Sequence, residues 1–316
     1  MMYLDPIILD IVATLIGILA AITVILSFLL VDYIKKIRNE KFEFFKITDN
    51  LDNNENQIKK FHQYLEKIDN TQQNRLLETD NLNNLAQFYK DNGQPTKALS
   101  YFEHVLKIQT EIGYKLGEAN TLRYIGEIYL QTNNLSEAEN FFNKSLQIHR
   151  ENDDKVGLAE DLFQIGSLLL NTNRLDQSLQ YFEEALQIQT EINNTWNKAD
   201  ILGSIGLVYN RKGDYLKANN FFENALEIHN ILGDKPRIAG DLGNLGVGYL
   251  NIGDLDHALG YFEKSLEIYQ KIGDKFEEAK CLSNIGMLYQ KKGDLDKSIA
   301  SLEKALNILL KKGGQI

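Results

Sequence analysis

The amino-acid sequence predicts an all-α protein, a solenoid of helix-turn-helix repeats preceded by a single transmembrane helix. Three observations lead to this prediction. Residues 11–31 are apolar and uncharged, the rest of the chain repeats with a period of 40 residues, and every repeat holds two stretches with apolar side chains at helical spacing. The composition, with 43% hydrophobic and 25% charged residues, is that of an ordinary folded protein.

Residues 11–31, IVATLIGILAAITVILSFLLV, are predicted to be a membrane anchor. A helix of this length, at about 1.5 Å per residue, spans a hydrocarbon core of about 30 Å. A cleaved signal peptide would need a basic start, whereas Asp5 and Asp10 are acidic and the basic residues follow the span. Because basic flanks stay in the cytoplasm, we expect residues 1–10 outside the cell membrane and the chain after residue 31 in the cytoplasm.

A stripe of small residues marks this predicted helix. Ala13, Gly17 and Ala21 lie four residues apart and therefore share one helix face. Small side chains let two helices approach closely in lipid, so the stripe is compatible with a homodimer formed through the span. The alternative is that glycine and alanine are simply common in spanning helices.

Six repeats follow a juxtamembrane segment, residues 32–56, and a degenerate half-repeat, residues 57–78, that is expected to cap the array. A juxtamembrane coiled coil is the alternative for residues 57–78. The predicted repeats are residues 79–118, 119–158, 159–198, 199–238, 239–278 and 279–316. A fixed period of this length is typical of solenoids, in which each unit buries its apolar face against its neighbours. Since no cap follows the last repeat, the apolar edge of helix 296–310 is expected to be exposed.

Each repeat is predicted to form two helices, and glycines mark both their packing and their ends. A glycine inside the first helix, such as Gly286, would cost about 1 kcal/mol relative to alanine. Its recurrence at the same repeat position predicts a close approach of the neighbouring helix. Left-handed glycines are expected to end the first helices of three repeats, with the next aspartate capping the second helix; they are Gly213, Gly253 and Gly293.

The junctions between repeats carry similar signals. Gly273 is expected to end a second helix, Asp274 to cap the next first helix, and Glu277 to complete a capping box. Pro95 and Pro236 fall in predicted first turns, where a missing N–H is harmless.

The repeat resembles the tetratricopeptide repeat, a family defined by large apolar residues, Leu-Gly, Tyr, Ala, Phe and Ala at set offsets. In the last repeat the matching residues are Leu282, Ile285, Gly286, Tyr289, Ser298, Leu302 and Ala305. The resemblance covers residues 79–316 and implies a right-handed solenoid. The usual period of the family is shorter, and the period of 40 is similar to that of the GoLoco-motif polarity adaptors, with kinesin light chains as more distant relatives.

The resemblance also implies a binding groove lined by the first helix of every repeat. With Ala119 as position one, position six reads Asn84, Tyr124, Gln164, Ser204, Asn244 and Asn284. A row of amides can bond the backbone of an extended peptide, as such asparagines do in the adaptors; the alternative is that they only solvate an exposed helix face. Neighbouring positions add Arg123, Arg211, Lys280 and Met287. The carboxylate clamp of some family members is absent, because Glu127 stands where an asparagine is required.

Nothing in the sequence predicts catalysis, a metal site or a cofactor. The histidines are His62, His104, His149, His229 and His257, and none has metal-ligand spacing. His149 and His229 share one repeat position and are predicted to fill a tolerant structural slot. Cys281, the single cysteine, is expected to be a buried inert thiol. The net charge of −10 argues against nucleic acid as a partner.

These observations predict a membrane-anchored interaction scaffold that binds a protein or peptide in its groove, rather than an enzyme acting on a small-molecule substrate. Two alternatives stay open. One is a regulatory sensor subunit that controls a partner enzyme, and the other is a structural component of a membrane assembly.

The orientation of the anchor can be tested directly. A reporter enzyme fused after Ile316 should be active in the cytoplasm, because the basic residues follow the span. Activity confined to the outer side of the membrane would reverse the predicted orientation.

Overall fold

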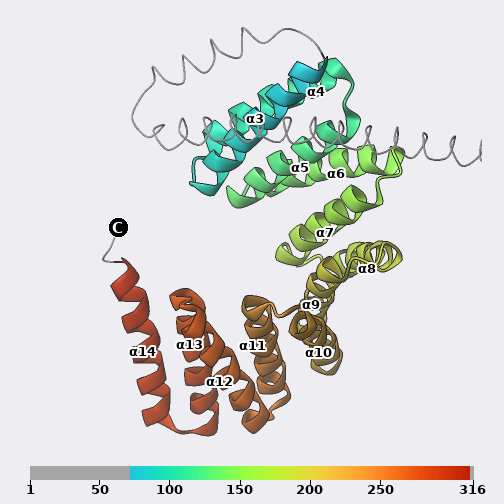
Figure 1. Ribbon diagram of the computed structural model, residues 1–316. Coiled ribbons are helices and arrows are strands. Elements are labelled where there is room, and N and C mark those ends of the chain that lie inside the picture. Colours follow the sequence, from blue (N-terminus) through green and yellow to red (C-terminus); the bar gives the residue numbers. More distant parts are fainter. Residues whose placement is uncertain (1–71, 314–316) are drawn as a thin grey trace, which may run out of the picture. The chain divides into compact units, whose positions relative to one another are not determined.

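The computed structural model describes residues 72–313, and within this range the chain forms twelve α-helices and no strand (Figure 1). The first helices of the repeats are α3 (Gln72–Asp91), α5 (Lys115–Gln131), α7 (Lys155–Asn171), α9 (Thr195–Arg211), α11 (Lys235–Ile252) and α13 (Lys275–Lys292). The second helices are α4 (Pro95–Ile112), α6 (Leu135–Glu151), α8 (Leu175–Glu191), α10 (Tyr215–Leu232), α12 (Leu255–Ile272) and α14 (Leu295–Gly313).

Each helix packs against the helices before and after it in sequence, as the ribbon shows for α11 to α14 (Figure 1). Contacts that skip one helix join first helices to one another: α5 to α7, α7 to α9, α9 to α11 and α11 to α13. The first helices from α5 to α13 therefore form a continuous layer. This arrangement confirms the predicted all-helical solenoid.

From the second repeat on, the first helices begin four residues before the predicted repeat starts, because their N-caps lie in the preceding turns. The side chains of Asp154, Asn194, Asp234 and Asp274 accept a backbone N–H from the first helical turn. Each cap satisfies one of the donors that a helix start leaves unpaired. Pro95 and Pro236 occupy first turns as predicted.

The predicted glycine stops are confirmed. Gly213, Gly253, Gly273 and Gly293 all have positive φ, between 79° and 95°. In other repeats Asn133, Asp153, Asn173 and Asn193 adopt the same left-handed conformation at the same place, which short polar side chains tolerate best after glycine.

The predicted capping box at Glu277 is not formed. The N–H of Asp274 already donates to the carbonyl of Tyr269 at 3.0 Å, as part of the turn that ends α12. The Glu277 carboxylate instead lies 3.2 Å from Nζ of Lys280. A backbone donor that is used by the preceding helix end is not available for a capping box.

The recurring glycines inside the first helices contact the recurring aromatic residues of the second helices. A Cβ added to Gly206 or Gly246 would lie 2.5 Å from the ring of Phe222 or Phe262, and at Gly126 or Gly166 it would meet a phenylalanine at 2.7 Å. The four phenylalanines, Phe142, Phe182, Phe222 and Phe262, are fully buried. The close approach predicted from sequence is therefore confirmed, with an aromatic ring as its cause.

The last helix lacks a neighbour on one side among the described residues. Leu302 occupies the position of these phenylalanines but is 41% exposed, and Ile299 and Leu306 are 55% and 54% exposed. This confirms the expected exposed edge of helix 296–310.

Several predictions fall outside the described residues: the span at residues 11–31 with its stripe, the juxtamembrane segment, and residues 57–71 of the half-repeat. Between residues 72 and 313, no helix combines the length and the apolar character that a membrane crossing requires.

The glycine–phenylalanine contact predicts opposite effects for two glycine-to-alanine substitutions. Gly206→Ala should lower the free energy of unfolding by roughly 1–3 kcal/mol, because the added methyl overlaps Phe222. Gly260→Ala should raise it by about 0.5–1 kcal/mol, because Gly260 lies in α12 with nothing within 4 Å of its added Cβ. Urea denaturation measures both, and equal stability of the two variants would contradict the packing role of Gly206.

Candidate functional site

The residues predicted to line a groove lie on the first helices, as expected. Asn84 is exposed on α3, and Gln164, Asn244 and Asn284 are half-buried on α7, α11 and α13. Their side-chain amides make no hydrogen bond within the described chain. Met287 is 47% exposed. We call the surface formed by the position-six residues and their neighbours on the first helices the groove face.

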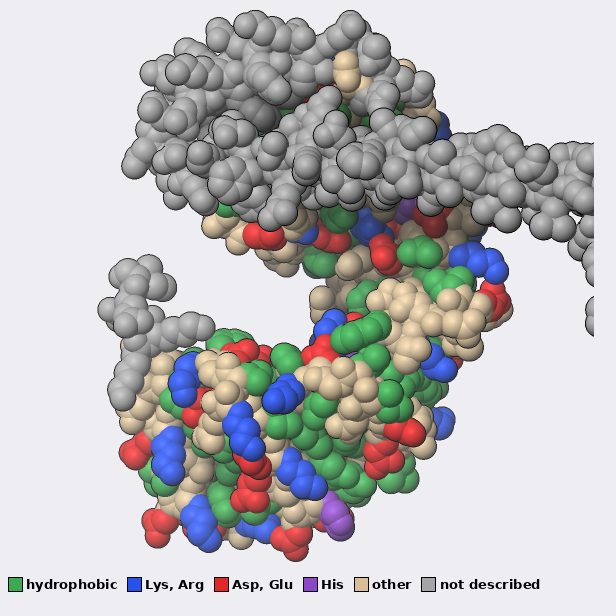
Figure 2. Space-filling view, in the orientation of Figure 1, with side chains coloured by type: hydrophobic (Ala, Val, Ile, Leu, Met, Phe, Trp, Pro, Cys, Tyr) green, Lys and Arg blue, Asp and Glu red, His purple; other side chains and the backbone are tan. Residues whose placement is uncertain are grey.

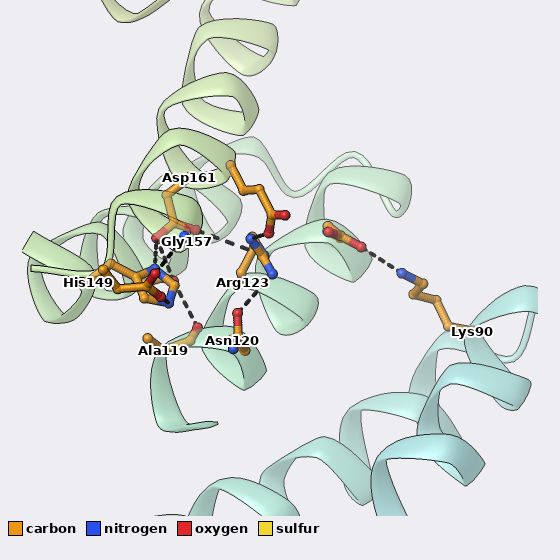
Figure 3. Close-up of polar contacts among 11 residues, drawn as sticks. Lys90, Ala119, Asn120, Arg123, His149, Gly157 and Asp161 are labelled. Atoms are coloured by element: carbon orange, nitrogen blue, oxygen red, sulfur yellow. Dashed lines mark hydrogen bonds and ion pairs between the residues drawn. The ribbon is translucent and has the colours of Figure 1, made fainter. Parts of the chain in front are cut away.

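Arg123 is held by the protein itself rather than offered to solvent. It is 6% exposed, and its guanidinium contacts the carboxylate of Glu160 on the next first helix. It also donates to Oδ1 of Asn120 at 2.9 Å and lies 4.0 Å from Oδ1 of Asp161 (Figure 3). Next to this cluster Lys90 pairs with Glu127 at 2.6 Å. These ion pairs tie consecutive first helices together.

Other predicted groove residues also bond within the array. Arg211 donates to the carbonyl of Leu170 on the preceding first helix. Ser204 donates to the carbonyl of Asp200 at 2.9 Å within α9. Lys280 is exposed and, among the described residues, pairs only with Glu277. Of these basic groups, Arg123 and Lys280 are paired with carboxylates and Arg211 is bonded to a backbone carbonyl.

A pocket of about 300 Å³ opens on the groove face and spans three consecutive first helices. We call it the α5–α7–α9 pocket. It contains the predicted residues Arg123, Tyr124 and Gln164. The full lining is Arg123, Tyr124, Glu127, Ala159, Glu160, Phe163, Gln164, Gln189, Asn197, Asp200 and Ile201.

Behind the groove face, one position on the second helices holds a buried polar side chain in each of four repeats. We call this position the slot; its residues are Gln109, His149, Gln189 and His229. His149 and His229 place Nδ1 at 2.7 Å and 2.6 Å from an aspartate twelve residues later, Asp161 and Asp241 respectively. Gln109 accepts a hydrogen bond from the Thr121 hydroxyl at 2.8 Å; the fourth slot residue is Gln189. In Figure 3, His149 lies against Asp161 and Gly157, where a Cβ at Gly157 would come within 2.4 Å of the imidazole.

His149 and His229 are buried and bonded within the array, as the predicted structural role requires. Histidine occurs with aspartate in both cases, and Gln109 occurs with Thr121. A buried polar group is costly without a partner, and in these three repeats the residue twelve positions later supplies one.

The carboxyl of Asp241 is perturbed by its surroundings. Burial raises the pKa of Asp241 to about 6, against the opposing effect of His229. Asp200 and Arg237 are the other charged groups that act on it. A carboxyl with such a pKa changes its charge close to neutral pH.

Cys281 is buried as predicted, with Sγ 3.2 Å from the Ser265 hydroxyl. Burial raises the pKa of the Cys281 thiol, which makes it a poor nucleophile. Among the residues that the structure describes, no group of three histidine, cysteine, aspartate or glutamate side chains is placed to hold a metal ion.

On the side drawn in Figure 2, basic and acidic side chains are interspersed with hydrophobic ones over the C-terminal helices. Many form exposed pairs, such as Lys292 with Asp256 at 2.6 Å and Lys212 with Asp176 at 2.5 Å. Exposed pairs of this kind contribute about 0–1 kcal/mol each.

The sequence profile of the tetratricopeptide repeat matches residues 78–151, 158–231 and 237–311. The chain belongs to the tetratricopeptide repeat (TPR) family. Among curated proteins, no sequence matches the chain.

Solved structures share this TPR fold at low sequence identity. The BtubC (BKLC) structure from P. vanneervenii is 20% identical with a TM-score of 0.61, over 68% of this chain and 91% of that one. A STAND protein with a tetratricopeptide repeat sensor from Pyrococcus horikoshii is 17% identical with a TM-score of 0.64, over 73% of this chain and 35% of that one. The Rap conjugation gene regulator of plasmid pLS20, in complex with the Phr* peptide, is 20% identical with a TM-score of 0.56, over 78% of each chain.

Sequence reasoning singled out three residues of the pocket, Arg123, Tyr124 and Gln164, as groove residues of the TPR array. Glu160, Gln189, Asn197 and Asp200 were not singled out, although all four line it. One signal was available. In the twelve-residue pairing of the slot, Gln189 is followed by Ile201, which has no polar group to offer.

The perturbed carboxyl of Asp241 predicts a pH-dependent stability. Its pKa in the folded TPR array is above the value of 3.8 for a free carboxyl, so its contribution to the free energy of unfolding falls as pH rises from about 4 to about 6. Asp241→Asn removes the ionisable carboxyl, so the free energy of unfolding of the variant does not fall for this reason as pH rises. Relative to the wild type, the variant should gain up to about 3 kcal/mol between pH 4 and pH 7.

Urea denaturation at pH 4 and pH 7 measures that difference. The control is Asp256→Asn, since the Asp256 side chain is 91% exposed and its single ion pair contributes little at either pH. A stability difference for Asp241→Asn that is the same at both pH values would contradict the burial effect.

Proposed function

We propose that the groove face of this TPR scaffold binds an extended segment of a partner protein or a peptide. The α5–α7–α9 pocket is the observation that carries the proposal. It joins three repeats, as an extended ligand lying across the first helices requires, and it includes the position-six residues Tyr124 and Gln164.

The amide side chains of the groove face support the same function. Gln164, Asn244 and Asn284 have no hydrogen-bond partner within the described chain and are half-buried on α7, α11 and α13. An amide presents a donor and an acceptor together, as a peptide backbone does. Ser204 interrupts the row because its hydroxyl is used within α9.

Two similar structures are compatible with this proposal. The plasmid pLS20 regulator was solved with the Phr* peptide bound. The tetratricopeptide repeats of the Pyrococcus horikoshii STAND protein are described as a sensor, which favours a second candidate: the array as a regulatory sensor whose occupied groove controls a partner enzyme.

We further propose that residues 11–31 anchor the array to the cell membrane with residues 1–10 outside and the groove in the cytoplasm. The support is the uncharged segment with basic residues only after it. The stripe Ala13, Gly17 and Ala21 would then allow two arrays to pair through their spans. The period of 40 residues, with GDK junctions, supports a relation to the GoLoco-motif polarity adaptors, and the exposed edge of α14 suits a structural role in a membrane assembly.

The groove can be tested by site-specific crosslinking in cells that produce the full chain. With the photoreactive amino acid p-benzoylphenylalanine in place of Gln164 or Asn244, irradiation should yield a discrete crosslinked product, because both residues are on the groove face. The matched control places the same amino acid at Glu183, which is exposed on α8.

Crosslinks that form equally at Glu183 and at the groove positions would mean non-selective capture. A product found at Glu183 but not at Gln164 or Asn244 would move the binding surface to the second helices. Once the partner segment is known, Asn244→Ala with Asn284→Ala should weaken its binding by about 1–3 kcal/mol, because backbone amides lose their partners.

A further inference from the structure

Three glycines of the first helices are not required by the packing of the array. Gly203 lies in α9, Gly240 and Gly243 lie in α11, and all three are half-buried. A Cβ added to any of them would come no closer than 3.5 Å to a neighbouring helix, whereas at Gly206 it would lie 2.5 Å from Phe222. Alanine would therefore fit at these three positions and would stabilise the helices. We call Gly203, Gly240 and Gly243 the open glycines.

The open glycines lie together on the groove face. Gly203 and Gly243 share one repeat position, immediately before the position-six residues, and Gly240 lies one turn before Gly243. Helices α9 and α11 contact each other. In the two preceding repeats the position of Gly203 is filled by Arg123 and Phe163, which line the α5–α7–α9 pocket. The groove face therefore carries large side chains on α5 and α7 and none at this position on α9 and α11.

Two unpaired oxygen atoms lie next to the open glycines. The hydroxyl of Tyr269 is 3.6 Å from the place that a Cβ of Gly240 would take, and Oδ1 of Asp241 is 3.8 Å from that of Gly203. Tyr269 is 6% exposed and Asp241 is 5% exposed. The other carboxylate oxygen, Oδ2, is bonded to His229. Neither Oδ1 nor the Tyr269 hydroxyl makes a hydrogen bond within the described chain, and neither atom is completely enclosed.

The equivalent site two repeats earlier shows the effect of a side chain in the place of Gly203. Asp161 corresponds to Asp241 and is bonded to His149 through Oδ2. Its Oδ1 is completely enclosed, and Arg123, at the position of Gly203, places Nε 4.0 Å from it (Figure 3). With glycine in that place, Oδ1 of Asp241 stays available as an acceptor for a group on the groove face.

A peptide main chain suits this part of the groove face better than an apolar side chain does. Glycine lets a ligand backbone approach closely. Because a main chain carries N–H and C=O groups, it can donate to Oδ1 of Asp241 and accept from the Tyr269 hydroxyl. An apolar side chain would cover both oxygens without bonding them, which is costly. The half-buried amides of Asn244 and Asn284, also unpartnered within the described chain, offer further donors and acceptors.

We infer that the open glycines form a main-chain subsite of the peptide groove, in which an extended segment of the ligand crosses α9 and α11 against the helix backbone. One N–H of the segment donates to Oδ1 of Asp241, and one carbonyl accepts from the Tyr269 hydroxyl. The inference rests on the proposed peptide-binding function and specifies that this part of the groove recognises the ligand backbone rather than its side chains.

Alanine at the open glycines should change stability and binding in opposite directions. Gly240→Ala and Gly243→Ala should each raise the melting temperature by roughly 1–4 °C, because alanine favours the helix and the new methyl meets no close contact. Affinity for a bound peptide should fall roughly tenfold or more, because the methyl takes the space of the ligand backbone. The matched control is Gly260→Ala in α12, which should raise the melting temperature similarly and leave the affinity unchanged.

Tyr269→Phe tests the hydroxyl separately. It should weaken peptide binding roughly threefold to tenfold, and the melting temperature should stay almost the same because no hydrogen bond within the described chain is lost. The control is Tyr261→Phe, which removes the hydroxyl of a ring that stacks on Tyr249 and lies on the second helix α12. This control should change neither quantity.

The probe is a peptide selected on the full wild-type chain in detergent from a random dodecapeptide library displayed on phage. Its binding to the wild type and to each variant is measured by fluorescence anisotropy. Methylation of one peptide nitrogen at a time then removes single main-chain donors. At least one N-methylated peptide should bind tenfold or more weakly, whereas alanine in place of the same residue should bind within about twofold of the parent peptide.

The outcomes distinguish the inference from the proposed function. If the wild-type chain selects no peptide at all, the peptide-binding function fails and the inference falls with it. If a selected peptide binds Gly240→Ala, Gly243→Ala and Tyr269→Phe as tightly as the wild type, or if only its side chains matter, the function stands and the main-chain subsite is wrong. A fall in melting temperature of both glycine variants would show that these glycines serve packing, which would also overturn the inference.

Discussion

The contact between a helical glycine and a buried aromatic ring sets the geometry of this array. In four repeats the ring of the second helix lies where the Cβ of any other residue on the first helix would be, as between Gly206 and Phe222. The glycine allows the two helices to approach, and the ring fills the space between them. In the last repeat, Leu302 takes the place of the ring against Gly286 at a similar distance. Because five of the six first helices are fixed to their partners in this way, the residues at equivalent positions recur on one face, which is the groove face.

The sequence was informative wherever a single residue type determines the local backbone. Gly253 and Gly293 end helices because their positive φ suits glycine, and Asp234 caps a helix because a carboxylate accepts the free N–H of the first turn. Such features depend on a few neighbouring residues. They can therefore be predicted without knowing what packs against the helix.

The pocket could not be predicted in the same way, because it depends on pairs that are far apart in the chain. The helical period places Arg123 on the groove face but does not show that Glu160 of the next repeat neutralises it. The contribution of Gln189 arises from the second layer of helices, through the absence of a partner on Ile201. A comparison of the repeats with one another shows this mismatch, whereas the position of Gln189 within its own helix does not.

The paired slot also limits how repeats of this kind can be exchanged. A histidine at the slot is satisfied by an aspartate that belongs to the following repeat, as with His229 and Asp241. The polar partnership therefore crosses the repeat boundary. Recombination that joined two repeats at that boundary would separate the partners and bury an unmatched charge, which is costly. A recombination point between the two residues of a pair is thus disfavoured. A recombination point in the loop that precedes the second helix leaves each pair intact.

The exposed face of α14 has a consequence for the order in which the array opens. In a linear array, stability is close to a sum of the units and the interfaces between neighbours. Helix α14 is held by α13 on one side, while Leu295, Ile299 and Leu310 are more than half exposed. Its amides should therefore exchange with solvent sooner than those of the interior helices, and opening should proceed from this end inward, one helix pair after another. The three repeats that frame the α5–α7–α9 pocket are then among the last to open, so that the site persists while the end of the array fluctuates.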